Sequence, residues 1–380
     1  MQLTIKQEHL NPILNNLTKA TAPRSPSPAL RGVLLETDEN ELVLNASDGD
    51  LSWRAWSPVR VGQPGKILLP ADSLSDLVRR LEPGELELAE DTQEEGSGVI
   101  IRWHGGETKI WAMDHDLYPP LLEESAQGIS FYGEELRRAM SKVLPAASRE
   151  EAPSKAIVRG VHVTLNEGKP RWEATDGVRL AVLDAQESPS TPSPSALDMV
   201  IPLRLVTEFA RFSGREGEVI LSEDENNLFA SWQDGELRYL LVCRRVTGRY
   251  PDTRDYLPKE YICRISVPTA AFAAAVERAM VINRLDSQTY PVKLRVDPEG
   301  NRLMVTASSS SVGTHKEYLN LDHWEGKPLE LAFNGRYLLD GLRTIEGTNT
   351  VFESSGVGAP ARITGENSHF FYLLLPLRLG

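Results

Sequence analysis

Apolar and polar positions along this chain form a recurring pattern that is clearest at residues 69–88. The segment begins with the end of an apolar run and Pro70, and it closes with a second strand-like run. Between them, Leu74, Leu77, Val78 and Leu81 follow Pro70 at offsets of four, seven, eight and eleven residues. Apolar residues at these offsets form the core-facing stripe of a helix. The pattern therefore predicts a strand end, an amphipathic helix, a turn and a strand.

The pattern returns at a constant interval. It opens at Pro70, at Pro202 and at Asn334, which are 132 residues apart each time. Two further signals, Arg-Gly-Val at 31–33 and Asp-Gly at 48–49, each return 128 residues later. Equal spacings with the same internal order predict a threefold repeat.

Each copy of the repeat holds two helical stretches, and a pair of short strand-like runs follows each stretch. The six predicted helices span 8–21, 71–82, 133–144, 202–213, 269–284 and 334–345. Short strands with tight turns are typical of antiparallel sheets that carry helices on one face. We therefore predict an α+β fold of three repeated domains, 1–126, 127–257 and 258–380, each made of two helix-plus-antiparallel-sheet half-units. Pro12 fits the first helix only within its first turn, because proline removes an interior hydrogen bond.

Composition places the chain among ordinary soluble globular proteins, with 41% hydrophobic and 25% charged residues in 380. No apolar run approaches the roughly 20 residues of a membrane helix, and the first ten residues do not resemble a signal peptide. The two cysteines, Cys243 and Cys263, fit a reducing cytoplasm. Their number favours two buried free thiols, with a disulfide between them as the alternative.

The net charge of −13 argues at first against a polyanionic partner. The six predicted helices nevertheless hold 12 basic and 9 acidic residues, so the charge is segregated along the chain. A mildly basic surface within an acidic protein can bind phosphates without sequence specificity. The alternative is that solvent-facing helix positions simply carry basic residues. Those on the predicted exposed faces are Arg79, Arg80, Arg137, Arg138, Lys142, Arg204, Arg211, Arg278, Arg284, Arg336 and Arg343.

A repeat that contacts itself head to tail can close into a ring. Three copies that together turn through half a circle would close as two chains, with the helices on the inner wall. This geometry depends on a rotation angle that the sequence does not contain.

No catalytic, metal or cofactor site is predicted. The chain has no Walker phosphate loop, no Cys/His cluster with zinc spacing and no Gly-x-Ser-x-Gly motif. Two stretches remain unusual. Residues 175–182 form a tight polar turn that leads into an apolar strand, which by itself favours a simple hairpin. Residues 370–380 are strongly apolar for a chain end, and those after Pro376, which cannot pair as a central strand, could form one wall of a peptide groove.

Four signatures carry a family resemblance. They are Thr-Asp-Gly at 175–177 with Arg-Leu-Ala-Val at 179–182, Gly-Arg-Tyr-Pro-Asp at 248–252 with Leu-Pro-Lys at 257–259, Phe-Asn at 333–334 with Tyr-Leu-Leu-Asp at 337–340, and Leu-Pro-Leu-Arg-Leu at 375–379. With them the chain resembles the bacterial DNA sliding clamps, the beta subunits of DNA polymerase III.

The resemblance implies a cytoplasmic, head-to-tail homodimeric ring whose helices surround duplex DNA without sequence specificity. It implies no enzymatic activity, no cofactor and no membrane association. It also implies a hydrophobic pocket between the second and third domains. This pocket would bind short motifs of the DNA polymerase III alpha subunit, the clamp loader and other proteins with a clamp-binding motif.

The resemblance also assigns residues to three surfaces. The pocket would be formed by Val158, Thr175, Gly177, Val178, Arg179, Leu180, Pro251, Tyr256, Leu373, Leu375, Pro376, Leu377 and Arg378. The DNA-facing residues would be Arg24, Arg79, Arg80, Arg137, Arg138, Lys142, Arg204, Arg211, Arg278 and Arg343. The seam of the dimer would pair the strand around Ile110 with Val281 and Ile282 at the end of the fifth helix. Val178 departs from the family, which usually has His or Tyr there, and Asp255 replaces a common basic residue.

Two other function classes compete with the clamp. A peptide-binding adaptor could use the same repeats without encircling DNA, and it would be a monomer. An enzyme is disfavoured by the missing motifs.

Overall fold

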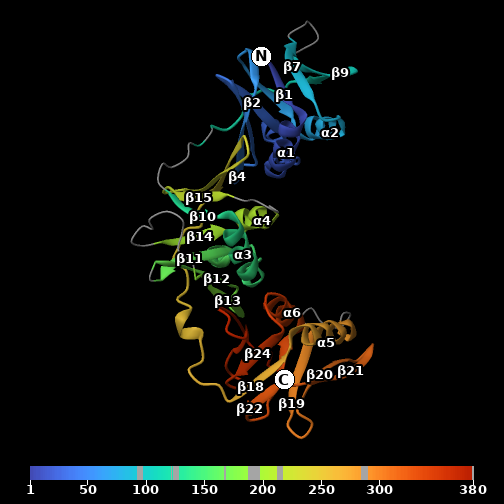
Figure 1. Ribbon diagram of the computed structural model, residues 1–380, viewed down its shortest axis with the longest axis vertical. Coiled ribbons are helices and arrows are strands. Elements are labelled where there is room, and N and C mark those ends of the chain that lie inside the picture. Colours follow the sequence, from blue (N-terminus) through green and yellow to red (C-terminus); the bar gives the residue numbers. More distant parts are fainter. Residues whose placement is uncertain are drawn as a thin grey trace. The chain divides into compact units, whose positions relative to one another are not determined.

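The computed structural model describes residues 1–91, 97–120, 122, 128–166, 168–186, 197–211, 217–283 and 290–378 (Figure 1). These residues form two compact units. The first is built mainly from Met1–Leu136 and Arg211–Arg245, and the second mainly from Arg137–Pro189 and Val246–Gly380. Each unit is described separately below.

Six α-helices occur in the described part of the chain, and they agree with the predicted spans to within a few residues. They are α1 (Gln7–Leu17), α2 (Ala71–Arg80), α3 (Gly133–Val143), α4 (Leu203–Arg211), α5 (Thr269–Ile282) and α6 (Gly335–Arg343). Short 3-10 helices are η1 (Thr18–Ala20), η2 (Pro28–Arg31), η3 (Leu144–Ala146), η4 (Pro153–Val158) and η5 (Arg254–Tyr256). In α2, Leu74 and Val78 are fully buried, so the predicted apolar stripe is confirmed.

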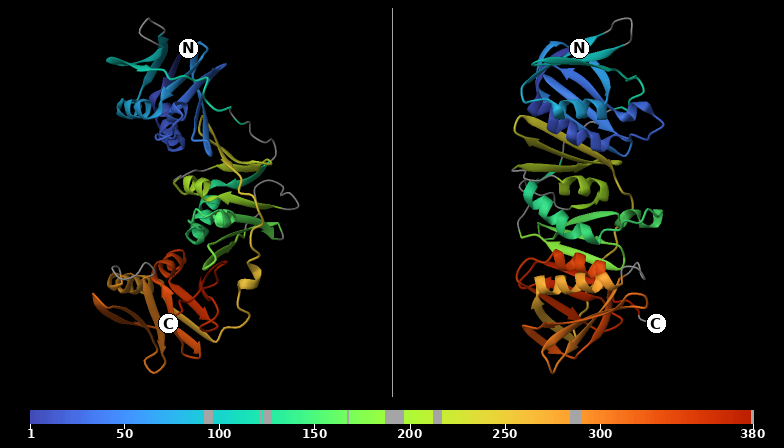
Figure 2. Two further views of the ribbon diagram at one scale, coloured as in Figure 1. Left: turned by 180° about the vertical axis from the view of Figure 1, so that it is seen from behind. Right: turned by 90° about the vertical axis from the view of Figure 1, so that its right-hand side faces the viewer.

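The first unit contains two antiparallel sheets. In spatial order, the five-stranded sheet is β5 (Arg60–Gln63), β1 (Gln2–Lys6), β7 (Glu85–Asp91), β8 (Gly98–Trp103) and β9 (Gly106–Trp111). The eight-stranded sheet is β10 (Gly128–Tyr132), β15 (Glu218–Glu223), β16 (Asn227–Asp234), β17 (Leu237–Arg244), β4 (Leu51–Pro58), β3 (Glu41–Ser47), β2 (Gly32–Asp38) and β6 (Lys66–Pro70). Helices α1 and α2 pack against each other (Figure 2).

The second unit also contains two antiparallel sheets. The nine-stranded sheet is β14 (Asp198–Pro202), β11 (Gly160–Asn166), β12 (Lys169–Thr175), β13 (Arg179–Asp184), β26 (Phe370–Leu374), β25 (Ala361–Gly365), β24 (Asn349–Ser354), β18 (Cys263–Pro268) and β22 (His323–Gly326). The four-stranded sheet is β21 (Gly313–Asn320), β20 (Arg302–Ser309), β19 (Pro291–Asp297) and β23 (Glu330–Asn334). Helices α5 and α6 lie side by side (Figure 2).

The element order repeats one half-unit six times. Each half-unit is a strand, a helix and three strands, for example β10, α3 and β11 to β13. The predicted duplication is confirmed, but the predicted strand pair is a triplet. The opening strand of each half-unit joins the triplet of the neighbouring half-unit, so that β10 pairs with β15 and β14 pairs with β11. Each domain is therefore closed by an exchange of strands between its two halves.

The last strands of the triplets join one copy of the repeat to the next. Strand β4 of the first copy pairs with β17 of the second, and β13 of the second copy pairs with β26 of the third. The corresponding strands β9 and β21 end their sheets without such a partner within the described residues. Trp53 on β4 lies 5.5 Å from Trp232 and 6.2 Å from Tyr239, ring centre to ring centre, so aromatic packing reinforces the first junction.

Two smaller expectations are also decided by the structure. Pro12 lies inside α1 and beyond its first turn, so the prediction that it must lie in the first turn is wrong. The helix tolerates it although proline cannot donate to the carbonyl of Glu8. Cys243 and Cys263 are free and buried, as the cysteine count favoured.

No helix in the described ranges is long and apolar enough to span a membrane.

Candidate functional site

The turn between β12 and β13 is held by side chains of its own. The Asp176 carboxylate accepts hydrogen bonds from the amides of Val178 and Arg179 at 2.9 and 3.1 Å. The Thr175 hydroxyl donates to the Arg179 carbonyl at 2.6 Å. Gly177 has a φ of 92°, which a residue with a side chain rarely adopts. The hairpin predicted for 175–182 is confirmed, and the turn holds Val178 at its tip, 43% exposed.

The C-terminal segment lies beside this hairpin although it is about two hundred residues away in sequence. Strand β26 pairs with β13, and Leu180 lies opposite Leu373. Leu180, Val182, Phe371 and Leu373 form a buried cluster against which Leu257 packs. The structure thus brings together two of the stretches that the sequence marked as unusual.

Beyond β26 the chain remains attached to the turn. The Leu375 amide donates to the Val178 carbonyl at 3.0 Å, and the Leu377 amide donates to the Ala332 carbonyl at 2.7 Å. Pro376 and Leu377 are half-buried, and Arg378 is exposed. Leu379 and Gly380 lie outside the described residues.

Three large side chains remain exposed around the buried cluster. Val178, Tyr256 and Leu375 are exposed by 43, 47 and 38%. We call these three side chains, together with Leu180 and Leu373 of the buried cluster, the apolar surface. Of the other predicted pocket residues, Val158 is buried at the end of η4 and Pro251 is half-buried. An apolar area framed by polar backbone suits a short apolar peptide.

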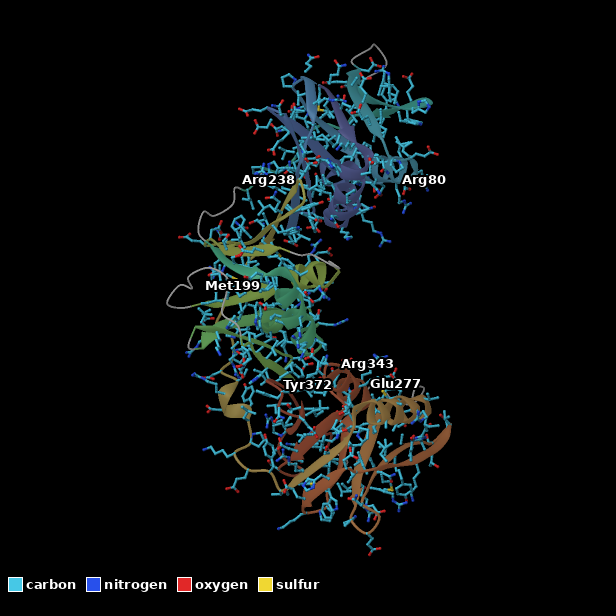
Figure 3. The ribbon with its side chains drawn as sticks, in the orientation of Figure 1. Arg80, Met199, Arg238, Glu277, Arg343 and Tyr372 are labelled. Atoms are coloured by element: carbon cyan, nitrogen blue, oxygen red, sulfur yellow. The ribbon has the colours of Figure 1, made fainter. Side chains whose placement is uncertain are left out.

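The side chain of Arg179, a predicted pocket residue, is held by several partners. Its side chain is 7% exposed, and its guanidinium contacts Asp340 at 2.7 Å and Asp176 at 2.9 Å. It also stacks 3.8 Å from the centre of the Tyr337 ring and donates to the hydroxyl of Tyr372, which Figure 3 labels. Burial opposes the charge of Arg179, but its hydroxyl and carboxylate partners raise its pKa above the usual value. Arg179 thus joins the second and third copies of the repeat, and its predicted part in the peptide pocket stays a prediction.

A cavity of about 700 Å³, lined by both polar and apolar side chains, lies on the same side of the turn as the Arg179 guanidinium. Its lining includes Arg149, Arg179, Arg336, Tyr337 and Asp340. The sequence analysis used Tyr337 and Asp340 only as family signatures. Their spacing of three residues places them on one face of α6, which could have indicated a shared partner.

Removal of the Asp340 carboxylate is expected to lower stability. Asp340→Ala should reduce the free energy of unfolding by about 2 kcal/mol, because Arg179 stays buried with only Asp176 as its ionic partner. Urea denaturation measures this loss. Asp255→Ala, at an exposed position of the same unit, is the control and should change stability by less than about 0.5 kcal/mol. Equal stabilities of the two variants would contradict the role of the Arg179 cluster.

The predicted DNA-facing residues differ in their surroundings. Arg24, Arg79, Arg80, Arg138, Arg204, Arg278 and Arg343 are exposed, and Arg137 is half-buried. The side chains of Arg211 and Arg284 lie outside the described residues. Lys142 is 8% exposed and its Nζ lies 2.8 Å from Glu346, so its prediction as a solvent-facing cation is wrong. Lys142 lies in the last turn of α3, and its Nζ is also 5.5 Å from the centre of the Phe370 ring.

Carboxylates neighbour most of these arginines. Arg343 pairs with Glu277 at 2.6 Å, and Figure 3 labels both side chains. Similar pairs join Arg79 to Asp76, Arg80 to Asp76, Arg138 to Glu346 and Arg278 to Glu317. An ion pair reduces the field that a cation exerts on a phosphate. These helix faces are thus only mildly basic.

The predicted seam residues lie near the ends of β9 and α5 and differ in exposure. Ile110 is on β9, the last strand of its sheet, and is 8% exposed. Val281 is 66% exposed at the end of α5, and Ile282 is half-buried. The sequence analysis missed β21, which is the matching edge strand of the second unit. Its sequence, residues 313–320, contains only Tyr318 and Leu319 as large apolar residues, so it carried no alternating apolar signal.

No group of three or more His, Cys, Asp or Glu side chains suited to a metal ion occurs among the described residues.

The domains of one family match the chain in order. They are the N-terminal, central and C-terminal domains of the DNA polymerase III beta subunit, at residues 1–121, 131–252 and 254–378. The beta sliding clamp of Synechococcus elongatus is 28% identical over 100% of both chains. The crystal structure of the Bacillus subtilis DNA polymerase sliding clamp has a TM-score of 0.90 and 26% identity over 100% of both chains. The C. crescentus beta sliding clamp has a TM-score of 0.87 and 26% identity, over 100% of this chain and 99% of that chain.

A three-domain clamp built from antiparallel sheets and helices is the class of protein that these features define. The chain belongs to the family of DNA polymerase III beta subunits. Its function is that of a DNA sliding clamp in replication, as the sequence predicted. The peptide adaptor that does not encircle DNA receives no support.

Proposed function

We propose that two copies of this chain close head to tail into a ring around duplex DNA. The sheet edges at β9 and β21, which have no further strand partner among the described residues, support this proposal. They are the third strands of their half-units, and the equivalent strands pair as β4 with β17 and as β13 with β26. The same rule predicts that β9 of one chain pairs with β21 of another, beside Ile110, Val281 and Ile282.

The helix faces would hold DNA loosely. Sliding requires weak contacts with phosphates, since tight binding would hold the ring in place. The arginine–carboxylate pairs on α2, α3, α5 and α6 support such weak contacts. Arg24 and Arg204 are exposed on the described surface and would add direct contacts.

The apolar surface would bind short motifs of partner proteins. In this proposal the partners are the DNA polymerase III alpha subunit, the clamp loader and other proteins with a clamp-binding motif. The protein acts in the cytoplasm as a non-catalytic accessory subunit, with domain limits at 1–126, 127–257 and 258–380.

Retention on DNA tests the ring directly. The protein is loaded onto a nicked circular plasmid by its clamp loader with ATP, washed at high salt and separated from free protein by gel filtration. We expect it to remain on the circle and to leave once a restriction enzyme linearises the plasmid. Equal retention on circular and linear DNA would exclude a topological link.

A further inference from the structure

An ionic cluster lies away from the apolar surface, at the β14 end of the nine-stranded sheet. Its His162 and Glu173 side chains are buried, and its Asp198 side chain is 81% exposed. His162 on β11 is 7% exposed. Its Nδ1 lies 2.8 Å from Glu173 on β12, and its Nε2 lies 2.8 Å from Asp198 on β14. One imidazole therefore bridges carboxylates from the two neighbouring strands. Neither the clamp fold nor DNA binding gives this cluster a role.

The cluster also holds the connector, which we define as residues 246–257 between β17 and β18. The second carboxylate oxygen of Glu173 accepts a hydrogen bond from the hydroxyl of Thr253, which is 2% exposed. The ring of Tyr250 stacks on the His162 imidazole, with centres 4.3 Å apart and planes 24° apart. Tyr250 and Thr253 lie on either side of Pro251 in the sequence. The cluster therefore contacts the connector both before and after that residue.

The connector carries three residues toward the apolar surface. Pro251 and Tyr256 are predicted pocket residues, and Leu257 packs on the buried cluster of β13 and β26. A displacement of the connector would therefore move one side of the proposed peptide site.

The two contacts of His162 require a protonated ring. A neutral imidazole donates from one nitrogen only, and the other nitrogen would face a carboxylate oxygen. Burial alone lowers the pKa of His162, but the hydrogen bonds and charges of Glu173 and Asp198 outweigh burial and raise it above its usual value. Other charged or titratable groups at this site are Arg171, 3.9 Å from Glu173 and paired with Asp184 at 2.7 Å, the exposed Arg254, whose charge also acts on Glu173, and the buried phenol of Tyr250.

We propose that His162, as an imidazolium, and Glu173 are positioning residues that fix the connector and so set the affinity of the apolar surface for peptides. This inference rests on the proposed peptide site. The direction of its pH dependence follows from the raised pKa. The stabilisation is complete below the unfolded-state pKa, about 6.5, and is lost as the pH rises through the higher folded-state value. Deprotonation leaves the ring with one donor for two carboxylates and removes the positive charge beside the buried Glu173 carboxylate, so Glu173, the acceptor of Thr253, is held less firmly.

Hydrogen exchange of the full-length protein tests the grip without any ligand. Once intrinsic rates are corrected, exchange across 246–257 should be slow at pH 6 and several-fold faster at pH 9. The double variant H162L/E173V replaces the buried ion pair by apolar side chains, which folded proteins commonly tolerate. Its connector should exchange rapidly at both pH values, and circular dichroism verifies that it folds. A wild-type connector that exchanges equally at both pH values, or a double variant that matches wild type, would overturn the proposal.

Peptide binding tests the consequence for function. Fluorescence anisotropy with a labelled pentapeptide that contains leucine and phenylalanine should give a several-fold higher Kd for Thr253→Val. Thr253→Ser keeps the hydroxyl and should bind as wild type does. Equal affinity of all three proteins would overturn the positioning role. A wild-type protein that shows the exchange profile but binds no peptide would instead overturn the proposed peptide site and leave the grip on the connector intact.

Discussion

A chain that lacks residues 377–380 is expected to lose partner-peptide binding while it still forms the dimer. The Leu377 amide hydrogen-bonds to Ala332 at 2.7 Å, so this residue lies against β23 beside the apolar surface. Its removal takes away one wall of the site, and a buried apolar anchor often contributes 2 kcal/mol or more to binding. The Kd should therefore rise by at least about 30-fold. Fluorescence anisotropy measures the Kd, and light scattering measures the mass.

Val357→Asp is the control for this deletion. Val357 lies in a loop of the same unit and is 68% exposed, so the variant tests whether any loss of exposed apolar surface weakens binding. It should bind the peptide with wild-type affinity. If the deletion binds normally, the assignment of the tail to the peptide site is wrong.

Val281→Asp is expected to convert the dimer to monomers at low concentration. Val281 is 66% exposed in the single chain, so an aspartate there should disturb the monomer little. In the proposed seam it would bury an unpaired carboxylate, which costs several kcal/mol. The dimer should then dissociate at protein concentrations at least about 100-fold higher than in the wild type. Light scattering across a dilution series measures this shift.

The structure explains why Val281 is a better test than Ile110. Ile110 is only 8% exposed and lies opposite Val99 within its own sheet, so a charge there would damage the monomer as well. Val357→Asp again serves as the control, because it introduces the same charge at nearly the same exposure. Persistence of the dimer in Val281→Asp would place the seam elsewhere. The two variants should separate peptide binding from dimer formation. The tail deletion should lose peptide binding and keep the dimer, and Val281→Asp should lose the dimer and keep peptide binding.

The sequence predicted the helices well because their signal is local. The apolar stripes of the helices lie within short stretches of the chain, and they place all six helices within a few residues. The sequence predicted two strands after each helix and did not predict the third strand of the triplet. Strand β4, for example, alternates buried and half-buried residues, because Trp53 faces the core while Trp56 lies on the other face of the sheet. Short alternating runs of this kind carry a weak periodic signal.

The site was less predictable, because side-chain direction depends on distant residues. The motif places Arg179 on the correct turn, but only the pairing of β13 with β26 and the approach of α6 decide that its guanidinium meets Asp340. Lys142 is buried for a similar reason, since Glu346 attracts it from two hundred residues away in the chain. His162 gave no signal at all, because its partners come from two other strands and the connector.

The junction between successive copies of the repeat occurs twice in this chain, once where β4 pairs with β17 and once where β13 pairs with β26. The side chains at the two junctions differ. Leu375 donates its amide to the Val178 carbonyl at 3.0 Å, and at the first junction Arg244 donates its amide to the Asp50 carbonyl at 3.2 Å. The backbone is the same, but an apolar pair occupies one junction and an ionic pair, 3.9 Å apart, occupies the other. An apolar peptide would have to dehydrate both charges to dock on the ionic version. We therefore expect each chain to bind one partner peptide, at the junction of the second and third copies, and none at the junction of the first and second.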